Sequence, residues 1–139
     1  MDLSADMLAA VAATASDRGL GNLQTVESAA ETLPFDDGAF DFLACRYSAH
    51  HWGDLEGGIR QARRVLKDGS PAVFIDAVAA GSALADTHLQ AVELLRDTSH
   101  VRDYSPAEWM AMLARTGFTV ESTRTVSYTH LTLPTRDLV

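Results

Sequence analysis

The stretch FDFLACRYSAHHW, residues 40–52, joins an apolar run to two adjacent histidines and a tryptophan. Its first half, Phe40 to Cys45, holds one acid in an otherwise apolar run, which is typical of a buried strand. The run PAVFIDAV, residues 71–78, is similar, and its first position is one where a strand tolerates proline. Between the two runs, apolar residues recur at helical spacing at Leu55, Ile59, Ala62 and Leu66. This order predicts two parallel strands joined by a helix.

Helices and strands alternate along the rest of the chain as well. Ser4 can cap a helix, and Ser105 opens a capping box with proline at the first helical position. The elements expected outside the central unit are a helix over 5–17, a strand over 22–28, a helix over 82–97, a helix from Ser105 to Gly117 and a strand over 118–124. This alternation predicts an α/β fold with a mostly parallel sheet and helices on both faces, an architecture that binds nucleotides and cofactors.

Composition narrows the class of protein. The 139 residues suit one domain, and 47% hydrophobic with 22% charged residues is usual for a globular domain. The net charge of −8 disfavours binding to nucleic acid or to an anionic membrane surface, because polyanions would be repelled. One cysteine allows no internal disulfide, and no apolar run approaches the ~20 residues of a membrane span. Residues 1–8 lack the basic cluster of a signal peptide, so the expected location is the cytoplasm.

Four segments together resemble a known family. They are DLSADML (2–8), AETLPFDDGAFDF (30–42), RYSAHHW (46–52) and ARRVLKDGS (62–70). In this order and spacing they are similar to the class I S-adenosylmethionine-dependent methyltransferases, specifically the UbiE-like group of small-molecule enzymes. The similarity runs from Asp2 to about Val126. It implies a Rossmann-like sheet, S-adenosyl-L-methionine as the cofactor, and transfer of its methyl group to a small-molecule acceptor.

The resemblance assigns cofactor contacts to the first two segments. In the family, an acidic residue at the end of the second strand binds both ribose hydroxyls, and Asp2 matches that position. Leu3 would then pack on the adenine. Family members often accept the adenine amino group with an aspartate, but Ala29 stands there, which leaves adenine recognition to the backbone near Ala30 and Glu31 or to water. The alternatives are that Asp2 is only a helix-start acid and that Glu31 is a solvated loop acid.

The carboxyl end of the strand over 40–45 borders the crevice where open α/β sheets bind ligands. By resemblance, Cys45 and Arg46 lie near the methionine end of the cofactor, where the guanidinium could pair with its carboxylate. The alternative for Cys45 is a small core residue, which the sequence favours. The alternative for Arg46 is a surface salt bridge.

The two adjacent histidines, His50 and His51, have three possible roles. A metal site is disfavoured, because adjacent side chains point in different directions and the chain has no CxxC or HxxxH pair; we expect no metal. By resemblance, the segment lines the pocket near the transferred methyl group, where one of the two could act as a base. Trp52 and Asp76 are further candidates for the substrate pocket. The alternative is that both histidines only shape the pocket and cap the next helix.

The family's glycine-rich turn after the first strand has no match in this chain, because Gly19 and Gly21 follow a helix. We therefore expect an N-terminally truncated fragment whose sheet is incomplete, with the first strand and the glycine-rich loop absent. Residues 1–126 would be a partial methyltransferase catalytic domain. Residues 127–139 would be a non-native tail, since SYTHLTLPT resembles translated sequencing-adaptor DNA.

Such a fragment is expected to be poorly stable alone and to bind S-adenosylmethionine weakly, because it would expose apolar side chains such as those of Phe40, Phe42 and Leu43. The segment over 82–104 is expected to cap the acceptor site. Two other functions remain open at this point. One is a nicotinamide-dependent oxidoreductase, in which Asp2 would also bind a ribose. The other is a non-catalytic methyltransferase-like scaffold.

Overall fold

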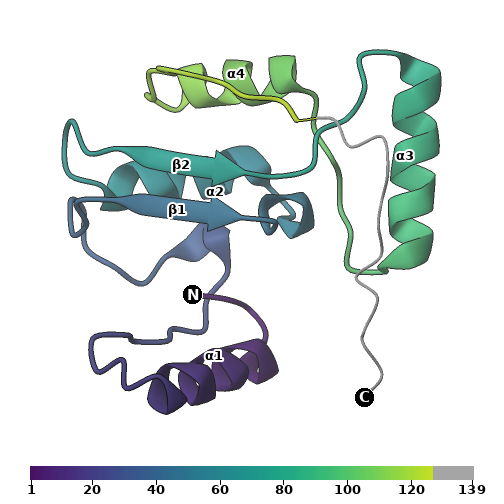
Figure 1. Cartoon of the computed structure of the whole chain (residues 1–139). Coiled ribbons are helices and arrows are strands. Elements are labelled where there is room, and N and C mark those ends of the chain that lie inside the picture. The colour runs from purple at the N-terminus through teal and green to yellow at the C-terminus, as the bar shows by residue number, and fades with distance from the viewer. Residues whose placement is uncertain (127–139) are drawn as a thin grey trace, which may run out of the picture.

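The computed structural model of the chain describes residues 1–126, and the expected tail lies outside the described residues. Its centre is a parallel pair of strands, β1 (Leu43–Arg46) and β2 (Ala72–Ile75), joined by the helix α2 (Leu55–Val65) (Figure 1). The pairing runs in register from Leu43 opposite Ala72 to Arg46 opposite Ile75. This confirms the order of the predicted strand–helix–strand unit, but both strands are shorter than the predicted runs over 40–45 and 71–78.

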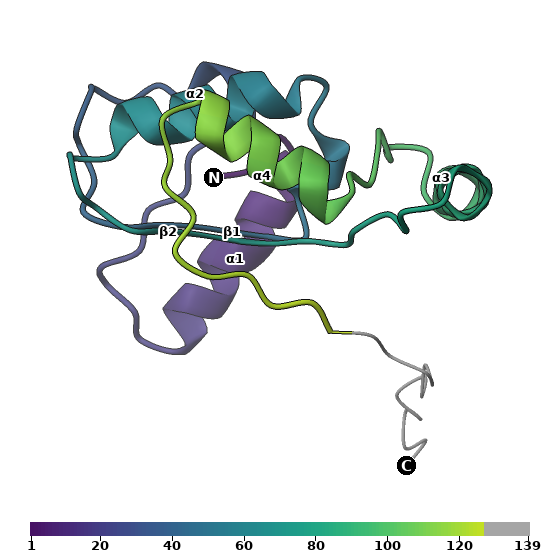
Figure 2. The same cartoon turned by 90° about the horizontal axis from the view of Figure 1, so that it is seen from above.

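The helix α2 contributes more buried residues than any other element of the described chain. It begins after Asp54, whose side chain accepts a hydrogen bond from the Gly57 amide at 2.9 Å. Its buried residues repeat along one face and are Leu55, Gly58, Ile59, Ala62 and Val65. That face packs with α4 (Pro106–Arg115), which contributes the buried side chains of Trp109 and Met112. Figure 2 shows α2 and α4 together on one side of the strands and α1 on the other.

The two strands bury one face and expose the other. Leu43, Cys45, Ala72 and Phe74 are partly buried, whereas the alternate positions Ala44, Arg46, Val73 and Ile75 are exposed. Phe40 and Phe42 are 38% and 55% exposed, which confirms their predicted exposure, although Leu43 is partly buried. Within residues 1–126 the sheet is therefore covered by helices on the α2 side and leaves apolar side chains open on its other face.

The N-terminal segment forms a separate small unit. Asp2 makes an isolated parallel bridge with Glu27, through Asp2 N–H to the Val26 carbonyl at 3.2 Å and Ser28 N–H to the Asp2 carbonyl at 3.1 Å. The helix α1 (Ala5–Asp17) follows, with the predicted cap at Ser4. The strand predicted over 22–28 is wrong in extent, because only this one bridge forms.

The C-terminal part contains α3 (Ala83–Arg96) and α4. The predicted capping box at Ser105 is confirmed, since its hydroxyl accepts from the Glu108 amide and the Glu108 carboxylate accepts from the Ser105 amide. The strand predicted over 118–124 is wrong. No neighbouring strand in residues 1–126 pairs with this segment, and Phe118 instead packs on the core beside Phe74.

Candidate functional site

The candidate site lies where β1 and β2 end, because parallel strands bring their carboxyl ends to one edge. Tyr47 follows β1 directly with φ +50°, the only positive φ at a non-glycine residue in the described chain. This turn leads into the short helix η2 (Ala49–His51). Asp76 follows β2 directly, and its carboxyl meets the first turn of η2. The two predicted candidates, His50 and Asp76, are thus brought together across the sheet edge.

His50 and Asp76 form a closely bonded pair. His50 Nδ1 lies 2.5 Å from Asp76 Oδ1, and the His50 amide donates to Asp76 Oδ2 at 3.2 Å. The side chains of His50 and Asp76 are 14% and 3% exposed. A carboxylate can only accept here, so Nδ1 carries the proton and Nε2 is left with its lone pair. The ring is held in one tautomer and orientation, which suits a general base.

The neighbouring His51 has different surroundings. Its Nδ1 lies 3.1 Å from both the Ser99 carbonyl oxygen and the Ser99 hydroxyl, in the loop after α3. The two imidazole rings have centroids 4.0 Å apart, but only His50 pairs with a carboxylate. No group of three or more His, Cys, Asp or Glu side chains in residues 1–126 is arranged to hold a metal ion. The geometry therefore singles out His50 as the candidate base.

Asp2 and Leu3 fit the cofactor contacts that the resemblance implies. Asp2 Oδ1 accepts the Ser4 amide at 2.8 Å, while Oδ2 has no hydrogen-bond partner within the described chain. A carboxylate fixed through one oxygen with the other open can accept hydrogen bonds from a ribose diol. Leu3 is 67% exposed beside it and can pack against an aromatic ring. The residues present therefore fit the ribose and adenine of S-adenosylmethionine.

The second predicted cofactor segment forms the short helix η1 (Ala30–Thr32). Ala30 is 5% exposed, so its contribution to a ligand would come from its backbone. Glu31 Oε1 accepts from the Asp54 amide at 3.0 Å. This bond joins η1 to the start of α2. Glu31 therefore makes a structural contact, which is distinct from the contact with adenine that the resemblance implies.

Cys45 and Arg46 point to opposite faces of β1. Cys45 packs against the core, and burial, helped by the negative charge of Asp76, raises the pKa of its thiol to about 11. It therefore stays a neutral thiol at physiological pH, as the core interpretation predicts. The exposed guanidinium of Arg46 lies over the Tyr47 ring, 5.1 Å from its centroid. It forms no salt bridge with any residue of the described range.

Trp52 anchors the histidine segment to the core. Its indole N–H donates to the Ser48 hydroxyl at 3.2 Å, and its ring lies on α2 at Gly58. A Cβ at Gly58 would come within 2.5 Å of the Trp52 ring, so only glycine allows this contact. Trp52 thus helps to fix the position of η2.

The loop over 97–104 contacts both histidines. The amides of Val101 and Arg102 both donate to the His50 carbonyl, at 2.9 and 3.1 Å. The loop also brings His100 close, with its ring centroid 5.8 Å from that of His50. The sequence did not reveal His100, Asp103 or Gln90 as site residues. No motif marks them, and their contacts depend on the path of the loop.

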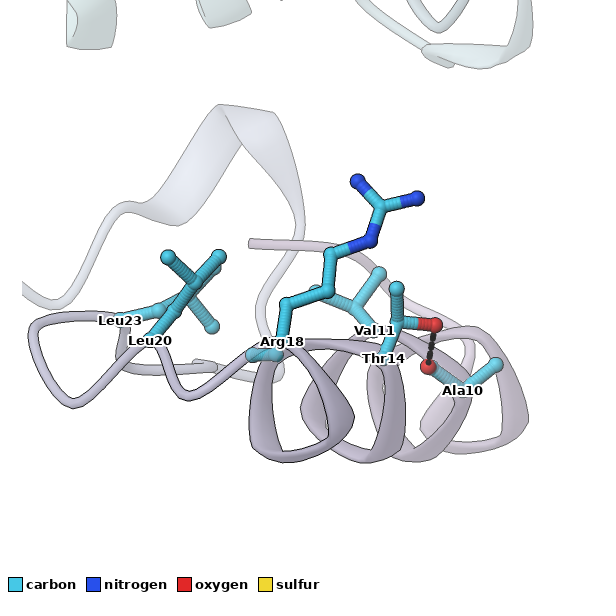
Figure 3. A pocket seen from close by; sticks show the side chains of 7 residues that line it. Ala10, Val11, Thr14, Arg18, Leu20 and Leu23 are labelled. Carbon is cyan, nitrogen blue, oxygen red and sulfur yellow. Dashed lines mark hydrogen bonds between the residues drawn. The ribbon is translucent and has the colours of Figure 1, made fainter.

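A separate hollow of about 260 Å³ lies beside α1 (Figure 3). It is lined by Ala10, Val11, Thr14, Ala15, Arg18, Leu20 and Leu23. Thr14 points its hydroxyl to the Ala10 carbonyl, and the lining holds no acid and no histidine. This hollow has no group for proton transfer and is not the candidate site. None of the helices in residues 1–126 has the length and apolar character needed to cross a membrane.

Comparison with known proteins identifies the family of the chain. The profile of the family described as "Methyltransferase domain" matches residues 1–74. The chain is 45% identical over 121 residues to the uncharacterized protein YafE of Escherichia coli K12, covering 87% of this chain and 58% of YafE. It is 35% identical over 114 residues to the uncharacterized methyltransferase YcgJ of Bacillus subtilis, covering 82% of this chain and 45% of YcgJ. The chain thus spans about half the length of these relatives.

Solved structures give the same result for the fold. The crystal structure of YcgJ superposes with a TM-score of 0.80 at 34% identity, covering 82% of this chain and 49% of that one. A candidate methyltransferase from Bacillus halodurans superposes with a TM-score of 0.84 at 33% identity, covering 87% of this chain and 52% of that one. These matches confirm the predicted Rossmann-like α/β fold. With the profile match over residues 1–74, they show that the chain belongs to the methyltransferase domain family.

Proposed function

We propose that the protein transfers a methyl group from S-adenosylmethionine to a small-molecule acceptor, and that His50 is the base that takes the acceptor's proton. The observation that carries this proposal is the bonded pair of His50 and Asp76 at the carboxyl ends of β1 and β2. That edge is where ligands bind in open α/β sheets. The cofactor of the chain's family is S-adenosylmethionine.

Each residue would have a defined task. Bound S-adenosylmethionine supplies a methyl group on a sulfonium sulfur, which is open to in-line attack by a nucleophile. Asp2 would hold the ribose and so set the position of the sulfonium end. His50 Nε2 would accept the proton as the acceptor atom bonds to the methyl carbon. Asp76, bonded to Nδ1, would stabilise the resulting imidazolium, as a carboxylate does when it orients a catalytic histidine.

The loop over 97–104 supports this proposal by closing one side of the site. Its bonds to the His50 carbonyl hold it against the histidine, and exclusion of water favours transfer to the intended acceptor. Trp52 would form the back of the pocket. Arg46, exposed at the end of β1, could bind the carboxylate of the cofactor, with Cys45 packed behind the strand.

We also infer a cytoplasmic location, no nucleic-acid or membrane partner, and no required metal. The net charge of −8 disfavours polyanionic partners, and the single cysteine suits a reducing compartment and offers no set of thiolate ligands for a metal.

The first test concerns the cofactor. Asp2→Ala in the full-length protein is expected to weaken S-adenosylmethionine binding by about 1.5–3 kcal/mol, or roughly 10- to 150-fold, because a charged hydrogen-bond acceptor is lost. Isothermal titration calorimetry measures this directly. The matched control is Asp6→Ala, which removes an exposed acid from the first turn of α1. Equal affinities for Asp2→Ala and the unaltered protein would refute the ribose assignment.

The same titration separates the alternatives. An oxidoreductase would bind a nicotinamide dinucleotide, whereas a methyltransferase binds S-adenosylmethionine in its place. A scaffold that has lost catalysis would bind neither, or would bind S-adenosylmethionine without turnover on any acceptor.

A further inference from the structure

The side-chain amide of Gln90, on α3, forms hydrogen bonds with all of its donors and acceptors. Its Oε1 accepts from the Asp103 amide at 3.0 Å and lies 2.9 Å from His100 Nε2. Its Nε2 donates to the Asp103 carbonyl at 2.8 Å and to Asp86 Oδ1 at 2.8 Å. An amide side chain offers two N–H donors and two acceptor positions, so every position is used. This side chain therefore joins α3 firmly to the loop that follows it.

The two bonds to Asp103 determine which way the Gln90 amide lies. Gln90 donates to the carbonyl of Asp103 and accepts from its N–H, so a rotated amide would place two donors or two acceptors opposite each other. The amide oxygen therefore faces His100, and because that oxygen only accepts, His100 Nε2 is the donor. One side chain of α3 thus holds the backbone of Asp103 and the ring of His100.

The residues that Gln90 holds lie directly beside the residues that bind the candidate base. The amides of Val101 and Arg102 both donate to the His50 carbonyl, at 2.9 and 3.1 Å. The residue before this pair and the residue after it are the two that Gln90 holds, and they are only 7% and 1% exposed. The loop therefore connects Gln90 to the backbone of His50 through two consecutive amides.

His50 is held from two directions. Asp76, at the end of β2, bonds to the ring and to the backbone N–H of His50, whereas the loop bonds to its carbonyl. The helix α3 also reaches the loop through Asp86, which accepts from the Arg102 guanidinium at 3.1 Å. Both side chains of this ion pair are partly exposed, so water weakens it. The bonds of Gln90 are therefore the stronger connection between α3 and the loop.

We infer that Gln90 is a positioning residue, which fixes the backbone of His50 through the loop and so keeps the base at a set distance from the acceptor. This inference rests on the proposed function, because it treats His50 as the base. A base must stay within hydrogen-bond reach of the proton that it takes, and small displacements lower turnover. Gln90 acts at a distance from the reacting atoms, through the amides of Val101 and Arg102.

The test is Gln90→Met, which keeps a similar size but cannot form these bonds, followed by amide hydrogen exchange in NMR spectra of the full-length protein. Loss of one hydrogen bond changes a local opening equilibrium roughly 2- to 13-fold, so the Val101 and Arg102 amides should exchange about tenfold faster. The decisive amide is that of His50, which bonds to Asp76 and not to the loop. It should exchange faster too, by about twofold or more.

The nitrogen resonances of the His50 ring give a second measurement. The bond from Nδ1 to Asp76 holds the neutral ring in one tautomer, so its two nitrogens should resonate far apart in the unaltered protein. Gln90→Met should move the two resonances toward each other, because a less fixed ring samples both tautomers. A residue that only stabilised the loop would leave these resonances unchanged.

Two further variants serve as controls. His88→Met places the same side chain at an exposed position of α3 and should change none of these quantities. Gln90→Glu keeps the size and an acceptor oxygen, but its carboxylate cannot donate to the Asp103 carbonyl, so it should act in the same direction as Gln90→Met. Unchanged exchange over 55–65 in each variant would show that the core stays folded.

Three results would overturn the inference. Faster exchange at Val101 and Arg102 with an unchanged His50 amide would mean that Gln90 stabilises only the loop. Unchanged exchange at all three amides would mean that its bonds hold nothing in place. An equal rise over 55–65 in both Gln90 variants would indicate a general loss of stability. These measurements need no cofactor, so failure of the proposed function would be seen separately, as absent S-adenosylmethionine binding in calorimetry.

Discussion

His50→Ala in the full-length protein is expected to lower turnover about 10²- to 10⁴-fold, the usual contribution of a general base. The reason is that, among the histidines of residues 1–126, His50 is the one whose ring is oriented by a bonded carboxylate, which leaves its Nε2 free to accept a proton. Steady-state kinetics with saturating S-adenosylmethionine measures this effect.

Two further variants make this prediction specific. Asp76→Asn keeps the size of the side chain but removes the charge that orients His50 and stabilises its protonated form, so turnover should fall in the same direction. His51→Ala is the matched control, because the His51 ring bonds to Ser99 and to no carboxylate of residues 1–126, so its loss should lower turnover only mildly. Equal, mild losses for His50→Ala and His51→Ala would mean that both histidines only shape the pocket.

Ile59→Ala is expected to lower the free energy of unfolding by about 2–5 kcal/mol. Ile59 is 0% exposed at the centre of the core shared by α2, α4 and η2, so truncation leaves a cavity as well as losing apolar contact. Urea denaturation of the full-length protein measures the change. The control is Arg60→Ala on the exposed side of the same helix, where the ion pair with Glu56 contributes at most about 0.5 kcal/mol.

If Ile59→Ala unfolded at the same urea concentration as the unaltered protein, the contact between α2 and α4 would not be the main core. The same variant has a second use. Ile59 lies in one cluster with Ala49 of η2. A cavity at Ile59 should therefore also make the position of His50 less fixed. Turnover should then fall further than the fraction of folded protein alone explains.

The helices were predictable from sequence because their signals are local. The cap at Ser4 and the capping box at Ser105 each lie within a few residues of the helix that they start, and both are found in the structure. The predicted strand over 118–124 alternates but has no partner in residues 1–126, and the one over 22–28 pairs only through the single bridge at Glu27. A strand is defined by pairing with another segment, and alternation alone says nothing about where that segment lies.

The residues of the candidate site also differ in how well the sequence predicts them. Asp2, His50 and Asp76 could be selected because each stands at a strand end or in a family segment. The bond between His50 and Asp76 joins residues 26 positions apart and follows from the crossover geometry. Gln90, His100 and Asp103 carried no signal, because their arrangement depends on how one loop crosses η2. The chemistry of single side chains could be predicted from the sequence, whereas the contacts between residues far apart in the chain could not.

The helix α3 buries none of its side chains, and polar contacts through Gln90 and Asp86 tie it to its own following loop. Figure 1 shows it standing beyond the carboxyl ends of the strands. With so little apolar area to expose, α3 should unfold locally at much lower free energy than α2. Amide hydrogen exchange would then be fast over 83–96 and slow over 55–65. In the proposed enzyme, such a helix would admit an acceptor and release a product by brief local unfolding, while the core stays folded.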